Sequence, residues 1–149
     1  NATVDLSELA AGIGRADPRD AIPPIDNPLY ESPDAAAEWL ALDEPGALVQ
    51  EAGIARFYPL SIMTRHEIVN TDFGDTPVAV TYCPLCNTAL AFDRRIDGEV
   101  IRLGVSGLLR NSDMVMWDDL TDYLGRDEQV RQWRLLLRRY PESFRRLLG

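Results

Sequence analysis

The chain has 149 residues and a net charge of −9, with 46% apolar and 26% charged residues. These values fit one ordinary globular domain with a core of its own. No apolar run is long enough to span a membrane, and the acidic body argues against a nucleic-acid partner, since phosphates attract basic surfaces. The first residue is Asn rather than Met, so we expect a processed form, a trimmed form or a fragment.

The N-terminal segment, residues 1–34, is rich in Pro, Gly, Asp and Ala. Proline removes backbone donors, so we expect an extended lead-in that wraps the domain instead of a helix. The stretch SPDAAAEWLAL then predicts a short helix capped by Ser32 or Asp34. The stretch GALVQEAGIARFYPL predicts two strands around a turn at residues 51–53.

The middle of the chain mixes one helical pattern with several strand patterns. SIMTRHEIVN has apolar residues and His66 at helical spacing, which predicts a helix over 61–69 opened by Ser61. GDTPVAVTYC and SDMVMWD predict strands, and Asp97–Gly98 predicts a hairpin turn between two β-patterned runs. We therefore predict an α+β domain over 1–125, with a β-rich core of antiparallel or mixed strands and short helices.

A helical, Arg-rich tail is predicted for residues 126–149, which carry seven arginines against three carboxylates. Apolar residues recur there every three or four positions, and Pro141 predicts a kink. Residues 126–148 are expected to dock on the chain's own sheet, on a partner helix or on an anionic membrane surface. The apolar stripe consists of Val130, Trp133, Leu137, Tyr140, Phe144 and Leu147.

Both cysteines of the chain, Cys83 and Cys86, lie in the stretch TYCPLCNTA. A Cys-Pro-x-Cys sequence resembles the glutaredoxin active site, but there a helix follows the motif and lowers the pKa of the first thiol. The residues after Cys86 alternate like a strand, which favours the metal-holding loops of rubredoxins and zinc ribbons. Asn87 fits such a loop, because Asn tolerates a left-handed backbone.

A third ligand is predicted in His66, the only histidine, which precedes the strand that delivers Cys83. We expect its ring to face the two sulfurs. Two thiolates and an imidazole suit zinc or copper, and Glu67, Asp113 or a water would supply a fourth ligand. Two other functions stay open: a thiol–disulfide oxidoreductase of the cell envelope, and a structural or partner-binding module with inert cysteines.

Several stretches along residues 5–122 together resemble the bacterial and archaeal family called domain of unknown function 3179. They include AIPPIDNP, HEIVN, PVAVTYCPLCNTALAFDR and GVSGLLRNSDMVMWD. The resemblance implies an exported protein or lipoprotein, located outside the cytoplasm, and it brings no established activity. Asn87 stands where many members have a small residue, and the Arg-rich tail stands where members continue with β-rich sequence. The resemblance also implies a second layer around the cysteines, made of Glu67, Asn70, Asn111, Ser112 and Asp113.

Overall fold

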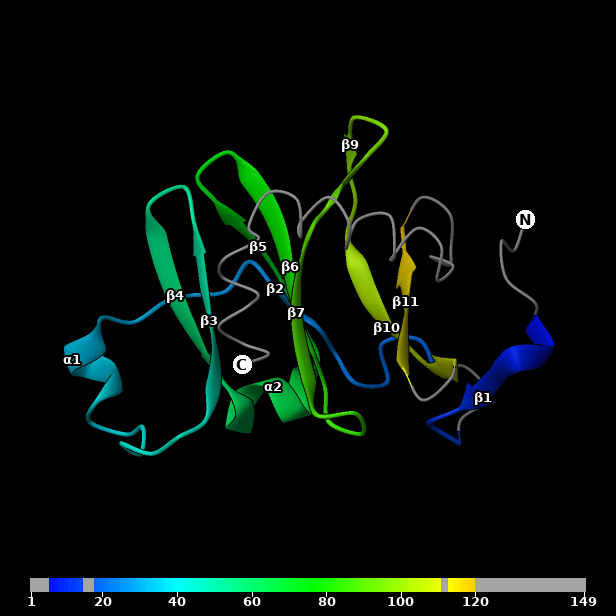
Figure 1. Cartoon of the computed structure of the whole chain (residues 1–149), viewed down its shortest axis with the longest axis horizontal. Coiled ribbons are helices and arrows are strands. Elements are labelled where there is room, and N and C mark those ends of the chain that lie inside the picture. Colours follow the sequence, from blue (N-terminus) through cyan, green and yellow to red (C-terminus); the bar gives the residue numbers. More distant parts are fainter. Residues whose placement is uncertain (1–5, 15–17, 111–112, 120–149) are drawn as a thin grey trace.

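Strands dominate this computed structural model, which describes residues 6–14, 18–110 and 113–119. The predicted β-rich α+β class is confirmed. Three groups of strands lie next to one another in Figure 1, with a four-stranded sheet between a hairpin and a three-stranded sheet. None of the helices in the described ranges is long and apolar enough to cross a membrane. The predicted Arg-rich helical tail, 126–149, lies outside the described residues.

The central sheet has the strand order β2-β5-β6-β7. Its strands are β2 (Ile25–Asp26), β5 (Ile68–Phe73), β6 (Thr76–Cys83) and β7 (Thr88–Asp93). β2 runs parallel to β5, and the other pairs are antiparallel. All residues of β6 after Thr76 are buried, because side chains on both faces of this sheet pack against other elements.

One face of the central sheet is covered by the hairpin of β3 (Gly46–Glu51) and β4 (Ile54–Pro59), followed by helix α2 (Leu60–His66). The turn between the strands uses positive φ angles at Ala52 and Gly53, as the sequence predicted. The strand predicted in GDTPVAVTYC is confirmed as β6, and one of its faces lies on this side. The buried cluster here contains Tyr58, Met63, Val69, Phe73, Val78, Val80 and Tyr82.

The opposite face packs against the sheet β1-β10-β11. It consists of β1 (Leu9–Ala11), which follows the 3-10 turn η1 (Leu6–Glu8), β10 (Leu103–Arg110) and β11 (Asp113–Asp118). The strand predicted in SDMVMWD is thus confirmed. We call the buried cluster between the two sheets the inter-sheet core. It contains Ile68, Ala79, Phe92, Ile101, Leu103, Val105 and Met116.

The helix predicted over 61–69 is shorter than expected. It begins at Leu60 and ends at His66, and Glu67 adopts a positive φ of 59° that stops it. Ile68 then starts β5, so Val69 belongs to a strand. The prediction was wrong because Ile62, His66 and Val69 fit helical spacing by coincidence, whereas burial of consecutive residues on the two faces of the central sheet decides the backbone.

The turn predicted at Asp97–Gly98 is present, with φ angles of 51° and 90°. It joins only the short strands β8 (Arg95–Ile96) and β9 (Glu99–Val100). The longer runs on either side do not pair with each other, because β7 pairs with β6 and β10 pairs with β11. The predicted hairpin is therefore a connection by which the chain leaves the central sheet and enters the other one.

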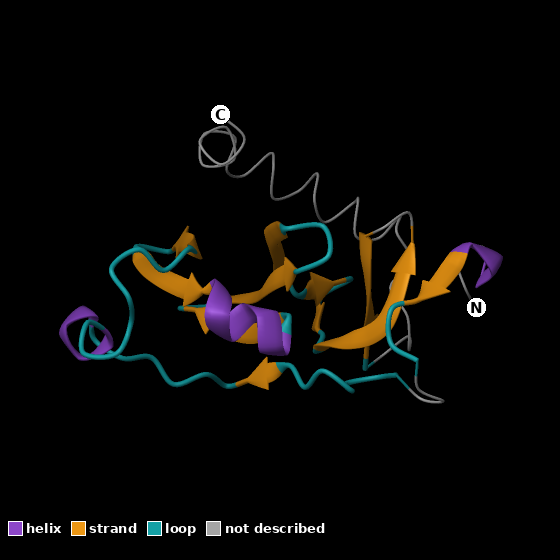
Figure 2. Cartoon of the chain, turned by 90° about the horizontal axis from the view of Figure 1, so that it is seen from below, coloured by secondary structure: helices purple, strands orange, loops and turns teal. Residues whose placement is uncertain are grey.

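The described part of the lead-in, residues 6–14 and 18–34, runs along the sheets in Figure 2. β1 pairs with β10, and β2 pairs with β5. Near its end, the predicted cap of helix α1 (Pro33–Ala36) is confirmed, because the Ser32 hydroxyl accepts a hydrogen bond from the Ala35 N–H at 3.2 Å.

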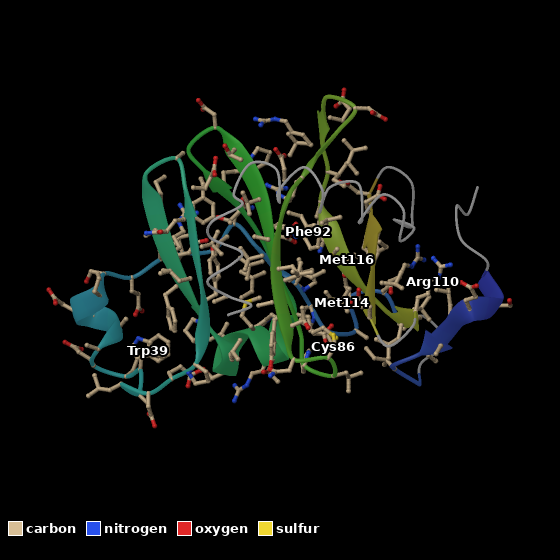
Figure 3. All side chains as sticks on the ribbon, viewed as in Figure 1. Trp39, Cys86, Phe92, Arg110, Met114 and Met116 are labelled. Carbon is tan, nitrogen blue, oxygen red and sulfur yellow. The ribbon has the colours of Figure 1, made fainter. Side chains whose placement is uncertain are left out.

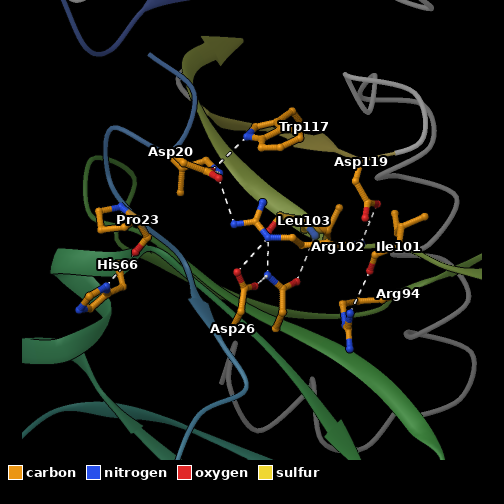
Figure 4. Close-up of polar contacts among 12 residues, drawn as sticks. Asp20, Pro23, Asp26, His66, Arg94, Ile101, Arg102, Leu103, Trp117 and Asp119 are labelled. Atoms are coloured by element: carbon orange, nitrogen blue, oxygen red, sulfur yellow. Dashed lines mark hydrogen bonds and ion pairs between the residues drawn. The ribbon is translucent and has the colours of Figure 1, made fainter. Parts of the chain in front are cut away.

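A group of residues joined by polar contacts, which we call the clamp, ties the lead-in and the two sheets together (Figure 4). Its members are Asp20, Asp26, Asn70, Arg102 and Leu103. The buried amide of Asn70, on β5, accepts from the Leu103 N–H at 3.1 Å and donates to the Leu103 carbonyl at 2.8 Å. Arg102 donates to Asp26 at 2.9 Å and to Asp20 at 3.0 Å. One amide therefore satisfies both backbone groups at the start of β10.

Replacing Asn70 by Ala should lower the free energy of unfolding by about 3 kcal/mol, because the buried N–H and C=O of Leu103 would lose this partner. Urea unfolding measures the change. Asn27→Asp is the matched control, since Asn27 is exposed and Asp also tolerates its positive φ. The control should change stability by less than about 0.5 kcal/mol. Equal stability of the two variants would contradict the role given to Asn70.

Candidate functional site

The two cysteines lie on a tight turn between β6 and β7, as predicted. Cys83 ends β6 and pairs in register with Thr88, the first residue of β7. Asn87 adopts a positive φ of 49°, and its side-chain oxygen accepts a hydrogen bond from the Tyr82 hydroxyl at 2.9 Å. No helix follows Cys86, which removes the feature that the glutaredoxin comparison requires.

Both thiols are free and lie close to each other. Cys83 is buried, whereas Cys86 is partly exposed, and its sulfur lies 3.8 Å from the Cys83 carbonyl oxygen. Leu85, between them, is 74% exposed and forms the tip of the turn. The turn thus directs one thiol toward the interior and leaves the other at the rim.

A small hollow of about 20 Å³ lies beside this turn, between the central sheet and β11. Cys83 lines it from one side, and Asp113, Met114 and Met116 line it from the other. Figure 3 shows Phe92, Met116, Met114 and Cys86 following one another in the same region of the molecule. The site therefore gathers two thiols and two thioethers, from segments about 30 residues apart in sequence.

Strand periodicity explains why these side chains meet. Along β6, Ala79 belongs to the inter-sheet core, and Thr81 and Cys83 follow on the same face at steps of two. On β11, Met114 and Met116 share a face for the same reason, and both pack against or within the inter-sheet core. The hollow is the place where this core reaches the turn.

The protein raises the pKa of the Cys86 thiol from its ordinary 9.0 to about 11. Burial contributes most, followed by the hydrogen bond and the charge of Cys83 and by the negative charge of Asp113. A hydrogen bond with Thr88 offsets part of the effect. The Cys86 thiol is thus protonated at neutral pH, in contrast to the low-pKa thiols of disulfide-exchange enzymes.

His66 lies in a different environment from the one predicted. Its Nδ1 is 2.8 Å from the Pro23 carbonyl oxygen, and a carbonyl only accepts, so Nδ1 carries the proton (Figure 4). Within the described ranges, no group of three or more His, Cys, Asp or Glu residues is placed to hold a metal ion. The set of Cys83, Cys86 and His66 is therefore not assembled there. The lead-in, whose path the sequence did not reveal, supplies the partner of His66.

The residues expected to form a second layer around the cysteines lie in different parts of the structure. Asp113 lines the hollow, and its charge acts on Cys86. Asn70 belongs to the clamp instead. Glu67 follows α2, and burial raises the pKa of its carboxyl group. Asn111 and Ser112 lie outside the described residues.

Met114 and Met116 are the site residues that sequence reasoning missed. In the sequence they indicate only part of a strand, because Met commonly fills core positions. Their alternate spacing, which places both on one face, was the available signal. The packing of one sheet on another was needed to bring that face to the cysteines.

Comparison with protein families places residues 19–126 in the family described as "Protein of unknown function (DUF3179)". The match covers more than half of the chain, so the chain belongs to this family, and the resemblance seen in the sequence is confirmed. No curated protein and no solved structure matches the chain.

The Cys86 thiol should make stability decrease at alkaline pH. With a raised folded pKa, its contribution is complete below pH 9.0 and is lost as the pH rises through about 11. Urea unfolding under reducing conditions, at intervals from pH 8 to pH 11.5, measures the decrease. We expect a difference on the order of 1 kcal/mol between wild type and Cys86→Ser, since partial exposure screens the shift.

Tyr58 serves as an internal reference in that experiment. Burial and a hydrogen bond with Tyr30 raise the pKa of its phenol, so it adds an alkaline loss of stability that both proteins share. Identical pH profiles for wild type and Cys86→Ser would contradict the environment described for Cys86.

Proposed function

We propose that this protein binds a soft metal ion through the thiolates of Cys83 and Cys86. The observation that carries the proposal is the placement of two free thiols on one strand-joining turn, beside a hollow of about 20 Å³. Thiolates prefer soft and borderline cations such as cuprous copper and zinc. The position of Asn87 with a positive φ supports a loop of the kind that presents two sulfurs to one ion.

The size of the hollow supports an ion over an organic substrate. A volume of about 20 Å³ is close to that of one water-sized particle, and sites for organic ligands are larger by more than tenfold. A bound ion would also replace the thiol protons, so that binding releases protons and becomes tighter as the pH rises.

Thiol–disulfide exchange is the second candidate, because two free cysteines three positions apart can in principle form a disulfide. It has less support for two reasons. A strand follows the motif instead of a helix, so no helix N-terminus stabilises a thiolate. In addition, Cys83, which would be the attacking thiol, is buried, whereas exchange requires an accessible thiolate. A structural module with inert cysteines is the third candidate.

Metal titration of the reduced protein tests the proposal. Wild type should bind one equivalent of Zn²⁺ or Cu⁺, and Cys83→Ser with Cys86→Ser should remove this binding. The metal should also raise the melting temperature of wild type, because it binds only the folded chain. Elemental analysis and thermal unfolding supply the two readouts.

Two control variants accompany the metal titration. Leu85→Ser alters the exposed tip of the same turn and should retain the metal. His66→Gln should also retain the metal, because the His66 ring is hydrogen-bonded to the Pro23 carbonyl. Stoichiometric binding by the double Cys variant would refute the proposal. Mixed disulfides trapped through Cys83 in Cys86→Ser would favour the exchange enzyme instead.

A further inference from the structure

We infer that the ion is cuprous copper and that the thioether of Met114 is its third ligand. This inference rests on the proposed function and deepens it, since it names the ion and a ligand that no sequence motif indicates. It is argued from the position of Met114, from the walls of the hollow and from the chemistry of thioethers.

The position of Met114 comes first. Met114 and Cys83 line the same hollow from opposite sheets, and Cys86 lies beside Cys83 on the turn. In Figure 3, Met114 lies between Met116 and Cys86. Met114 is only partly buried, whereas Met116 is 2% exposed and forms part of the inter-sheet core. Met114 is therefore the thioether nearer to the turn.

The walls of the hollow come second. Leu90 and Phe92 contribute apolar surface to it, and Thr81 and Thr88 contribute hydroxyl groups. Met116 lies deeper, on the same side as Met114. The wall formed by β11 therefore presents one carboxylate and two thioethers to Cys83.

Ligand chemistry comes third. A thioether is a neutral, polarisable donor, and this soft donor suits Cu⁺ better than Zn²⁺, which is a borderline ion. Zinc in structural sites takes four ligands from Cys, His and carboxylates. Among the described residues, those that line the hollow with Cys83 supply two thioethers, one carboxylate, two hydroxyls and two apolar side chains. Two thiols and one thioether supply three soft donors, a number that cuprous copper accepts.

The test compares Cu⁺ affinities of the whole chain under anaerobic, reducing conditions by competition with the chelator bicinchoninate. Met114→Leu keeps the volume of the side chain and removes the sulfur, so the fold should persist. It should weaken Cu⁺ binding by about tenfold or more, and leave Zn²⁺ binding unchanged. X-ray absorption at the copper edge should show three sulfur ligands in wild type and two in this variant.

Met116→Leu is the matched control, because it makes the same replacement two residues further along β11. It should leave Cu⁺ affinity and the sulfur count unchanged. Equal Cu⁺ affinity of wild type and Met114→Leu, or a loss confined to Met116→Leu, would overturn the inference while the thiol site stands. Failure of wild type to bind any of these ions, or binding that survives loss of both cysteines, would overturn the proposed function itself.

Discussion

The side-chain amide of Asn70 holds the two main sheets of this protein at a fixed distance. It satisfies both backbone groups of Leu103 and also donates to Asp26, so one buried residue joins β5, β10 and the lead-in. Arg102 reinforces the junction through Asp20 and Asp26. Because a buried backbone group without a partner is costly, few other arrangements of the two sheets would satisfy Leu103. The inter-sheet core and the hollow at its end both lie between the two sheets that this junction connects.

Strand register determines which side chains line the hollow. Cys83 faces the inter-sheet core because it lies an even number of residues from Ala79 on β6. A shift of one residue would turn Cys83 toward the cluster around Tyr58 and would turn Val80 toward the inter-sheet core. The register of β6 with β7 is set by the turn at Cys86 and Asn87, so the same residues position the sulfurs and maintain the sheet.

Local features of the fold could be predicted from the sequence, and distant ones could not. The left-handed Asn87, the Ser32 cap and the turn at Asp97–Gly98 depend on side chains within a few positions, and the sequence predicts each of them. The partner of His66 is Pro23, 43 residues away, and it depends on the path of the lead-in. Met114 joins the cysteines only because two sheets pack face to face. Neither contact can be predicted from the spacing of nearby residues alone.

The hollow also lies on a seam between two sheet edges. β7 ends the order β2-β5-β6-β7 and β11 ends the order β1-β10-β11 among the described strands. The clamp holds these sheets near Leu103, which pairs with Asp118, whereas Met114 is at the opposite end of β11. A change in the angle between the two sheets about the clamp would therefore change the span of the hollow. An ion bound by residues of both sheets would form a second connection between them and would make the interior stiffer. Binding at this small site would therefore increase the rigidity of the whole domain.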